Sequence, residues 1–518
     1  MTADRTTIDP DALTADAIRA GALAGRPVTV LGLARSGIGL VRFFRDAGAS
    51  VTIYDVRPSD ELAEAFSAVG PSGQGGLTLL AGPDVDPAAA LVGAHLVATS
   101  PSINPDYPTT EPRLRAALRA LVAARAAGEP GAPALVSEAD LFLRLCPAPT
   151  IGVTGTKGKT TTSSLIAALL AEDAAHPVEL GGNIGRPLVD VLPTLTPEHR
   201  VVVELSELQL PTLSRGTDVA VYTNVTSDHL DRHGSLEAYR AVKRRLAELT
   251  RARGGLLVLN GDDPFVAGLE RDYDRPMSGG WPGRTITRYR TAGTAADGVG
   301  VVDGRIVAAS IGEILPVGEL PLPGDHNVAN ALAAISVALH FAIPRAAIRR
   351  AVAAFQGVEH RLEPVMEVAG VRFVNDSQGT QPDAVAAALW AFPPPVVLIA
   401  GGRDKGVDLS PLGPVVADRA VAAVLIGESG PALEQLFRAS GLTETSQAAS
   451  LDEAVRRADD LARDALASRA PGTVATVLLS PAAASFDMFE DYAARGRAFK
   501  AAVAALAAEL AAKRAAGQ

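Results

Sequence analysis

IGVTGTKGKTTT, residues 151–162, predicts a short apolar strand, a loop with three glycines and the start of a helix. In this order the glycines let backbone N–H groups close around phosphate oxygens, and the helix N-terminus adds partial positive charge. Lys159 can reach the terminal phosphates and Thr160 offers a hydroxyl to a magnesium ion. The strict P-loop pattern has glycine where Val153 stands, so this is a variant of it. A glycine-rich turn that binds nothing leaves Lys159 and Thr160 unexplained, so we favour a nucleotide site.

Composition bounds the class of protein. The chain has 518 residues, enough for about two to four domains, and 47% of them are apolar. The net charge of −10 argues against nucleic acid as the main partner. Cys146 is the single cysteine, which excludes an internal disulfide and indicates a reducing compartment. The sequence shows no apolar run of about 18 residues and no signal-peptide pattern. We therefore expect no membrane span and a cytoplasmic protein.

The N-terminal region predicts a Rossmann-like βαβ unit, because residues 28–54 alternate strand, helix and strand. Gly32 and Gly37 are too few for the full dinucleotide fingerprint, whereas Asp55 lies about where a ribose-binding acid belongs. NAD binding, a purely structural unit and a different nucleotide are all compatible with this pattern, and we favour the last. Residues 1–25 predict a poorly ordered lead-in with one short helix.

Strands and helices continue to alternate after the phosphate loop, which predicts parallel sheets with helices on both faces. Glu204 stands near the end of an apolar strand, at the sheet edge where α/β proteins bind ligands. Two aspartates and two histidines crowd residues 228–233, and Lys243 lies one helix later. We predict an α/β fold with three domains: a Rossmann-like N-terminal domain (1–146), a central P-loop ATPase-type parallel sheet (147–356) and a C-terminal Rossmann-like α/β domain (357–518).

Two local patterns are specific enough to predict single features. Asp303-Gly304 lies between β-rich segments and predicts a tight turn. The alanine-rich C-terminal stretch predicts a last helix over about residues 482–511.

Ten motifs occur in the order in which they occur in a Mur ligase, and together they carry a resemblance to that family over roughly residues 28–500. They are GVTGTKGKTTT, GGNIG (181–185), ELSELQL (204–210), NVTSDHLDRH (224–233), YRAVKRRL (239–246), LPGDHNVANALAA (322–334), EHRLE (359–363), NDSQGTQ (375–381), GGRDKGVDLS (401–410) and LLSPAAASFDMFEDYAARGRAF (478–499). The last motif is particularly similar to the branch that adds D-glutamate. Folylpolyglutamate synthetases share the variant loop but have no Rossmann-like UDP-binding domain ahead of it.

The resemblance implies an ATP-dependent amide ligase that adds D-glutamate to UDP-N-acetylmuramoyl-L-alanine through an acyl phosphate, in peptidoglycan synthesis. It implies ATP and Mg²⁺ as cofactors and small molecules as the only substrates, and we expect a monomer. Two alternatives stay open: a Mur-type ligase for another amino acid such as L-glutamate, and a non-catalytic nucleotide-binding relative. An NAD-dependent oxidoreductase is a third, less favoured interpretation.

The resemblance also assigns roles to individual residues. UDP-sugar contacts are implied for Gly32, Asp55, Arg57 and Asn183. ATP contacts are implied for Gly155, Thr156, Lys157, Gly158, Lys159, Thr160, Thr161, His326, Asn327, Asn330, Arg361 and Asp376. Metal ligands are implied at Thr160, Glu204, His229 and, if it is carbamylated, Lys243, and D-glutamate contacts at Thr380, Lys405 and Ser485. The catalytic set is Lys159, His229 and Lys243.

Several of these residues have an ordinary interpretation when they are considered alone. His229 can be a loop histidine that bonds its neighbours, because imidazole is an unusual ligand for magnesium. Lys243 can lie on the solvated face of a helix, together with two neighbouring arginines. Lys405 can form a surface salt bridge, Ser485 can cap the last helix, and Arg361 can be a structural clamp.

Four positions depart from the usual family pattern. Gln378 stands where lysine is common, near the predicted amino-acid site. Glu207 and Leu208 replace a serine and an aromatic residue, which could alter contacts with the sugar or alanine. Ser102 replaces a glycine of the first domain, and Ala483 stands where cysteine is frequent.

Overall fold

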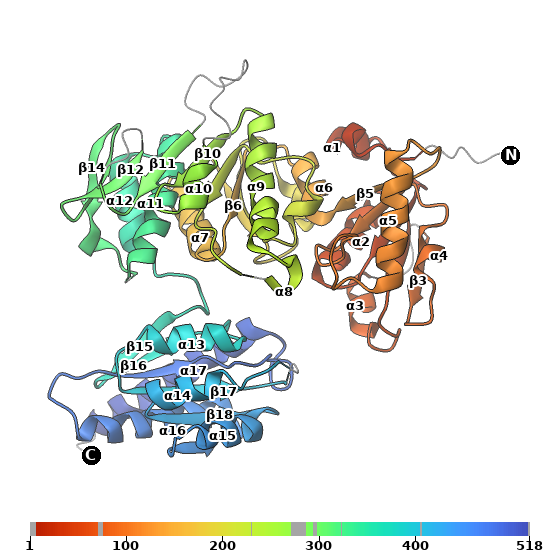
Figure 1. Ribbon diagram of the computed structural model, residues 1–518. Coiled ribbons are helices and arrows are strands. Elements are labelled where there is room, and N and C mark those ends of the chain that lie inside the picture. Colours follow the sequence, from red (N-terminus) through yellow and green to blue (C-terminus); the bar gives the residue numbers. More distant parts are fainter. Residues whose placement is uncertain are drawn as a thin grey trace. The chain divides into compact units, whose positions relative to one another are not determined.

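A computed structural model describes residues 7–70, 76–228, 230–270, 286–293, 298–322, 324–404 and 407–515. The chain divides into two compact units, Met1–Phe355 and Gln356–Gln518, which are coloured red to green and blue-green to blue in Figure 1. Each unit is built from α/β layers, as predicted. The two units divide between Phe355 and Gln356, and the predicted domain boundaries at 146/147 and 356/357 stay predictions.

The first sheet has five parallel strands in the order β3-β2-β1-β4-β5. They are β1 (Pro27–Leu31), β2 (Ser50–Asp55), β3 (Leu77–Ala81), β4 (Leu96–Thr99) and β5 (Ala134–Ser137). Helices α2 (Arg35–Asp46) and α5 (Pro112–Ala126) cover opposite faces. Because side chains alternate along a strand, Val30 packs with the α2 side and Leu31 with the α5 side. The strand order reverses beside β1, which is where Rossmann-like sheets bind their ligands.

The lead-in is better ordered than predicted. Residues 7–25 include the short helix α1 (Ala15–Arg19) and bury Ile8, Leu13 and Leu23 in the core. The backbone N–H of Ile8 donates to the carbonyl of His95 at 2.9 Å. The prediction of a poorly ordered segment was wrong for these residues, because three widely spaced apolar side chains anchor an otherwise polar stretch.

The central sheet has nine strands in the order β14-β13-β12-β11-β10-β9-β6-β8-β7. They are β6 (Thr150–Thr154), β7 (Val178–Gly182), β8 (Arg200–Glu204), β9 (Val219–Tyr222), β10 (Leu256–Asn260), β11 (Ile286–Arg290), β12 (Val299–Val302), β13 (Arg305–Ala308) and β14 (Gly312–Pro316). The sheet is parallel from β7 to β12 and continues as an antiparallel meander, β12-β13-β14. The turn at Asp303-Gly304 is confirmed, with φ of 49° and 70°.

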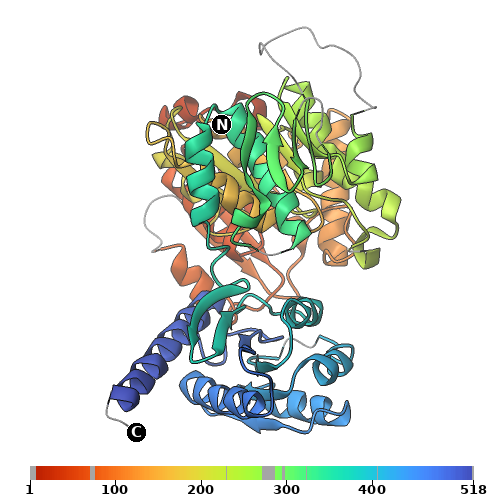
Figure 2. The ribbon, with the colours of Figure 1, turned by 90° about the vertical axis from the view of Figure 1, so that its left-hand side faces the viewer.

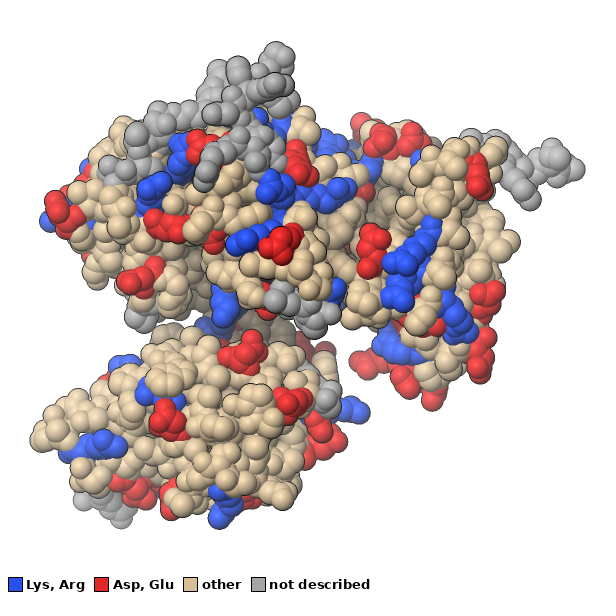
Figure 3. Space-filling model, viewed as in Figure 1, with Lys and Arg blue, Asp and Glu red and all other residues tan. Residues whose placement is uncertain are grey.

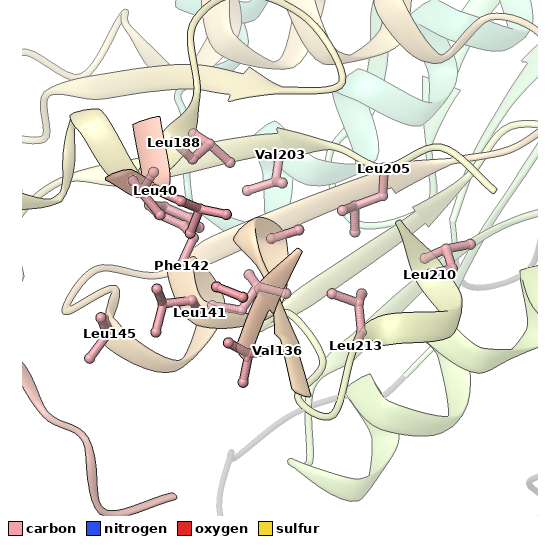
Figure 4. Close-up of a cluster of buried hydrophobic side chains, with 14 of the residues drawn as sticks. Leu40, Val136, Leu141, Phe142, Leu145, Leu188, Val203, Leu205, Leu210 and Leu213 are labelled. Atoms are coloured by element: carbon pink, nitrogen blue, oxygen red, sulfur yellow. The ribbon is translucent and has the colours of Figure 1, made fainter. Parts of the chain in front are cut away.

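Helices cover both faces of the central sheet. One face packs against α7 (Lys159–Leu170), α11 (Asp325–His340) and α12 (Arg345–Ala354). The other packs against α9 (Leu236–Ala252) and α10 (Pro264–Gly268). The core on this second face continues into the first domain through α6 (Glu138–Leu145), which packs against the short 3-10 helix η2 (Leu188–Asp190). Figure 4 shows this shared core, in which Leu40 of the first domain lies beside Leu188 of the central one.

The C-terminal unit has a six-stranded sheet in the order β15-β16-β20-β17-β18-β19, in which only the edge strand β15 is antiparallel. The strands are β15 (Glu363–Val368), β16 (Val371–Asn375), β17 (Val396–Gly401), β18 (Ala422–Ile426), β19 (Thr445–Gln447) and β20 (Ala475–Leu479). Helices α13 (Pro382–Trp390), α14 (Leu412–Arg419) and α15 (Gly430–Ala439) cover one face. Helices α16 (Leu451–Ala467) and α17 (Tyr492–Ala515) cover the other, and Figure 2 shows the length of α17.

The predicted start of the last helix at residue 482 was wrong. The helix α17 begins at Tyr492, after a loop that contains the alanines at 482–484. Ala482 adopts a positive φ of 57°, and Ala484 exchanges backbone hydrogen bonds with Arg403. These contacts hold the alanine run in the loop despite its helix propensity.

On the face of the molecule shown in Figure 3, acidic and basic side chains are interspersed. Among the described residues, no helix has both the length and the hydrophobicity that crossing a bilayer requires.

Candidate active site

The phosphate loop lies where β6 ends and α7 begins, as predicted. Gly158 is the residue before α7 and has a φ of 83°, a left-handed conformation that favours glycine. A Cβ at this position would collide with the side-chain oxygen of Asn330, and one at Gly155 would collide with the hydroxyl of Thr223. The loop is therefore closely packed against the end of β9 and the start of α11.

The residues after β9 hold this loop in place. The Thr223 hydroxyl donates to the carbonyl of Lys157 at 2.7 Å. The Asn224 side chain accepts from the N–H of Lys157 and donates to its carbonyl, both at 3.0 Å. The Lys159 ammonium lies over the loop and donates to the carbonyls of Gly155 and Thr156 at 3.0 and 2.8 Å. Uncharged neighbours thus hold the loop in place, and Lys157 and Lys159 supply its positive charge.

The two asparagines at the start of α11 belong to the same site. Asn330 is buried, and its side-chain oxygen accepts from the hydroxyl of Thr162 at 3.1 Å. Its amide nitrogen donates to the side-chain oxygen of Asn327 at 3.2 Å. His326 is exposed one residue before Asn327. The structure therefore places Asn330 beside the loop and Asn327 against Asn330, while contact of any of the three residues with a nucleotide base stays a prediction.

Glu204, at the end of β8, has a carboxylate that is only half satisfied. The residue is 1% exposed, and its Oε1 accepts from the side chain of Asn183 at 2.9 Å. Its Oε2 is buried and has no hydrogen-bond partner among the residues that the structure describes. An unpartnered buried carboxylate oxygen costs free energy, and a hard divalent cation is the kind of ligand that would satisfy it. Asn183, predicted to contact the UDP-sugar, lies against Glu204 and orients it.

Lys243 is fully buried, so its interpretation as part of a solvated helix face was wrong. Its ammonium donates to the Thr154 hydroxyl at 3.2 Å and to the Gly155 carbonyl at 3.0 Å. Burial, with a further contribution from the positive charge of Lys159, lowers the pKa of Lys243 to about 7. The helical spacing from Tyr239, one turn earlier and also buried, carried this signal in the sequence.

The arginines that flank Lys243 point elsewhere. The guanidinium groups of Arg240 and Arg244 lie over the ring of Phe265, at 5.4 and 5.6 Å from its centre. His229, the third predicted catalytic residue, lies outside the described residues. Sequence reasoning also missed Tyr239, whose hydroxyl is 3.0 Å from the hydroxyl of Thr156 in the loop.

In the first domain, Gly32, Asp55 and Arg57 come together at the carboxyl edge of the sheet. Asp55 accepts from the N–H of Leu33 at 2.8 Å and pairs with the guanidinium of Arg57 at 2.8 Å. Burial alone would raise the pKa of Asp55, but hydrogen bonds from Arg57 and the Leu33 backbone outweigh it and lower the pKa. A Cβ at Gly32 would approach Ile103 to 2.8 Å, so the glycine turn is closely packed.

In the C-terminal unit, Asp376 lies in a buried polar pocket at the end of β16. Its Oδ2 accepts from the Ser480 hydroxyl at 2.6 Å and its Oδ1 from the N–H of Leu362 at 3.2 Å. Burial raises the pKa of Asp376 to about 6, against these hydrogen bonds and the positive charge of Arg361. Arg361 itself is exposed. The amide oxygen of Gln378 is buried and has no partner within the described ranges.

A buried arginine that sequence reasoning missed connects two loops of this unit. Arg495 donates to the hydroxyl and carbonyl of Ser377, both at 3.0 Å. It also donates to the carbonyls of Ala484 and Ala483 at 3.1 and 3.2 Å. Burial lowers its pKa to about 10. Arg495 thereby joins the loops that carry Thr380 and Ser485.

Of the three predicted D-glutamate contacts, Thr380 and Ser485 are described, and Lys405 lies outside the described residues. Ser485 is buried, and its carbonyl accepts from the N–H of Phe489 at 2.8 Å. The alternative that Ser485 caps the last helix was wrong. Asp491 caps it instead, with its side chain accepting from the N–H of Ala494 at 2.6 Å.

Comparison with known proteins gives one consistent result. Residues 153–338 match the Mur ligase middle domain, and residues 360–483 match the Mur ligase, glutamate ligase domain. The UDP-N-acetylmuramoylalanine–D-glutamate ligase of Symbiobacterium thermophilum is 36% identical over 493 residues, 94% of this chain and 100% of that protein. The protein of the same name from Pelotomaculum thermopropionicum is 37% identical over 483 residues, 92% of this chain and 96% of that one.

A solved structure agrees at the level of the fold alone. UDP-N-acetylmuramate-alanine ligase MurC from Thermotoga maritima is 18% identical, with a TM-score of 0.50 over 91% of this chain and 98% of that chain. With two family domains and relatives above 35% identity along more than nine-tenths of its length, the chain belongs to the Mur ligase family, in the branch of the UDP-N-acetylmuramoylalanine–D-glutamate ligases.

Proposed function

We propose that this chain is an ATP-dependent ligase that joins D-glutamate to the alanine carboxylate of UDP-N-acetylmuramoyl-L-alanine, a step of peptidoglycan synthesis in the cytoplasm. One observation carries the proposal: a phosphate loop has Lys159 on it, buried Lys243 beneath it and Glu204 on the neighbouring strand. Phosphoryl transfer needs cationic groups and metal ligands of this kind, because the transferred phosphoryl group carries dense negative charge.

The residues present suit a magnesium ion. Glu204 offers a buried carboxylate oxygen that has no partner in the part of the chain that the structure describes, and Thr160 lies at the start of α7. We propose these two as ligands, with His229 as the third. When bound, Mg²⁺ would neutralise charge on the nucleotide phosphates. Asn183 would keep the Glu204 carboxylate oriented through the hydrogen bond at 2.9 Å.

The chain's own residues would bind and orient the reacting phosphate. The loop N–H groups and Lys159 would hold the terminal phosphates of ATP. The alanine carboxylate oxygen attacks the γ-phosphorus, and ADP leaves, which forms an acyl phosphate. The amine of D-glutamate then attacks the acyl carbon, and the tetrahedral intermediate expels phosphate. The released ammonium proton must be taken up by a base or by water.

We further propose that Lys243 is carbamylated. Only a neutral amine attacks CO₂, and burial beside Thr154 and Gly155 brings its pKa to about 7, so that a large fraction is neutral near that pH. The amine nitrogen bonds to the carbon of CO₂ and loses a proton, which leaves a carbamate anion. Beside Lys159 and a bound magnesium, the carbamate anion would have positively charged partners. The ammonium group of the unmodified lysine, in contrast, donates to two uncharged oxygens, those of Thr154 and Gly155.

The remaining contacts are proposals that follow from position. Gly32, Asp55 and Arg57 would bind the UDP end, at the edge of the first sheet where Rossmann-like folds bind nucleotides. Thr380, Lys405 and Ser485 would bind D-glutamate, and His326, Asn327, Asn330, Arg361 and Asp376 would complete the ATP site. We propose that the enzyme acts as a monomer.

Phosphate release by the purified chain with ATP, Mg²⁺ and UDP-N-acetylmuramoyl-L-alanine tests the function. We expect release to require D-glutamate, and the product mass to increase by one glutamyl residue. Turnover with L-glutamate or a diamino acid in place of D-glutamate would overturn the substrate assignment and leave the ligase reaction standing. ATP binding without any turnover would favour the non-catalytic alternative.

A further inference from the structure

Glu207 stands where the family resemblance leads one to expect serine. Its carboxylate could in principle face the substrate. The structure shows that it is instead buried, with 7% of the side chain exposed, and that its Oε1 accepts from Nη1 of Arg232 at 2.8 Å. Glu207 and Arg232 therefore form a largely buried ion pair.

This ion pair joins two segments that matter for the reaction. Glu207 follows Glu204 by three residues, in the turn after β8. Arg232 lies in the four-residue helix α8 (Leu230–His233), which begins directly after position 229 in the chain. Since Glu204 is a proposed metal ligand, the pair connects the turn directly after that ligand to α8.

Tyr107 reinforces the same contact from the first domain. Its buried hydroxyl donates to the backbone carbonyl of Glu207 at 2.8 Å. Its ring packs edge to face against the ring of His233, with the centres 6.0 Å apart. Three segments that are distant in sequence, around 107, 207 and 232, thus meet at one point.

The energetics make the pair a strong restraint. Attraction between charges is stronger in a poorly hydrated site than in water, and removing one partner leaves the other charge buried without compensation. A serine at position 207 is too short to reach the guanidinium group. A glutamine keeps the shape and one acceptor but loses the charge.

We propose that Glu207 is a positioning residue: it holds Arg232, and with it α8, against the turn that follows Glu204, and so sets the magnesium requirement of the ligase. This inference rests on the proposed function, in which Glu204 binds magnesium. Its structural half, the anchoring of α8, holds independently of any activity.

Hydrogen exchange of the backbone amides of α8 tests the anchoring. We expect exchange in α8 to be faster in Glu207→Ser than in the wild type, and intermediate in Glu207→Gln. Asp173→Asn is the matched control, because it removes the ion pair of Asp173 with Arg200, at 2.8 Å, from the opposite end of β8. Unchanged exchange in Glu207→Ser, or an equal increase in Asp173→Asn, would overturn the proposal, whether or not the chain proves to be a ligase.

The magnesium dependence of product formation tests the second half. Because Glu207 lies in the turn that directly follows Glu204, its loss should displace that proposed ligand. We expect the half-saturating Mg²⁺ concentration to rise about 10-fold in Glu207→Ser, the size of effect typical when the surroundings of a metal ligand are disturbed. Glu207→Gln should lie between Glu207→Ser and the wild type, and Asp173→Asn should match the wild type. If Glu207→Ser is inactive, Mn²⁺ binding in the presence of ATP replaces the activity assay. A wild-type metal dependence or Mn²⁺ affinity in Glu207→Ser would refute the positioning role, while an inactive wild type would refute the proposed function instead.

Discussion

At the scale of single residues, the site is built from buried ionisable groups. Glu204 has one oxygen without a partner among the described residues, and Lys243 and Asp376 are held at pKa values near neutrality by burial. The sequence indicated Glu204 because it follows an apolar strand. The sequence could not indicate that Lys243 is buried unless one knew which face of α9 points into the core. Arginines on both sides of Lys243 suggested an exposed face. Arg495 gave no signal, because its partners are backbone carbonyls of distant loops.

Lys243 leads to a prediction on CO₂ and pH. In enzyme freed of CO₂, we expect activity to recover when bicarbonate is added, and to recover faster at about pH 8 than at about pH 6 at equal dissolved CO₂. The reason is that the neutral amine becomes the major form as pH rises above a pKa of about 7. Lys243→Met should lose activity at least about 100-fold, whereas Lys513→Met, at an exposed position of α17, should not. Recovery that does not depend on pH would contradict this account.

Asp376 leads to a prediction on stability. Its folded pKa of about 6 lies above the ordinary value of about 4, so the folded state binds a proton that the unfolded state releases between those values. Its contribution to stability is present below about pH 4 and is lost as pH rises through about 6. We expect Asp376→Asn to stabilise the C-terminal unit by about 1–3 kcal/mol at pH 7, as thermal unfolding measures. A lower stability of this variant at pH 7 would show that the ionised carboxylate is favourable where it lies.

At the scale of elements, apolar runs located the strands well, because parallel strands are buried on both faces and are continuous in the sequence. The phosphate loop was also predictable, since glycine spacing and strand-to-helix order are local properties. The start of α17 was not, because hydrogen bonds to Arg403 and the positive φ of Ala482 override the helix propensity of the alanines. The ion pair of Glu207 with Arg232 depends on tertiary packing and leaves no local pattern.

The phosphate loop leads to a prediction at this scale. Gly158→Ala should weaken ATP binding at least about 10-fold, because a Cβ would meet Asn330 and the residue has a left-handed φ of 83°. The control is Gly304→Ala, where φ is 70° but no atom lies within 4 Å of the added Cβ. Both variants should be destabilised by about 1–3 kcal/mol of backbone strain, and only the first should change the ATP titration. Equal ATP affinity in both would contradict the role of this turn.

At the scale of the whole molecule, the first and central domains share one hydrophobic core through α6, whereas the C-terminal unit has cores of its own. The sequence predicted three domains but gave no sign of this shared core. Phe142 and Leu188 pack in the same core although their segments, α6 and η2, are distant in the sequence. Each segment alone has an ordinary amphipathic pattern. We therefore expect a chain with three sheets to unfold in two transitions, one for Met1–Phe355 and one for Gln356–Gln518.

Phe142→Ala tests this division. The side chain is fully buried in the shared core, and its loss should destabilise Met1–Phe355 by about 3–5 kcal/mol. In calorimetry we expect one transition, containing both the first and the central domain, to move to lower temperature. The transition of Gln356–Gln518 should stay in place. Separate shifts for the first and central domains would show that they do not unfold together.

We infer that this site activates a substrate carboxylate by phosphoryl transfer before D-glutamate attacks. The most direct measurement uses UDP-N-acetylmuramoyl-L-alanine whose alanine carboxylate carries a heavy oxygen isotope, with ATP, Mg²⁺ and D-glutamate. We expect each turnover to transfer one labelled oxygen to the released phosphate and to yield the D-glutamyl product. Phosphate without label, or labelled phosphate without a D-glutamyl product, would contradict it.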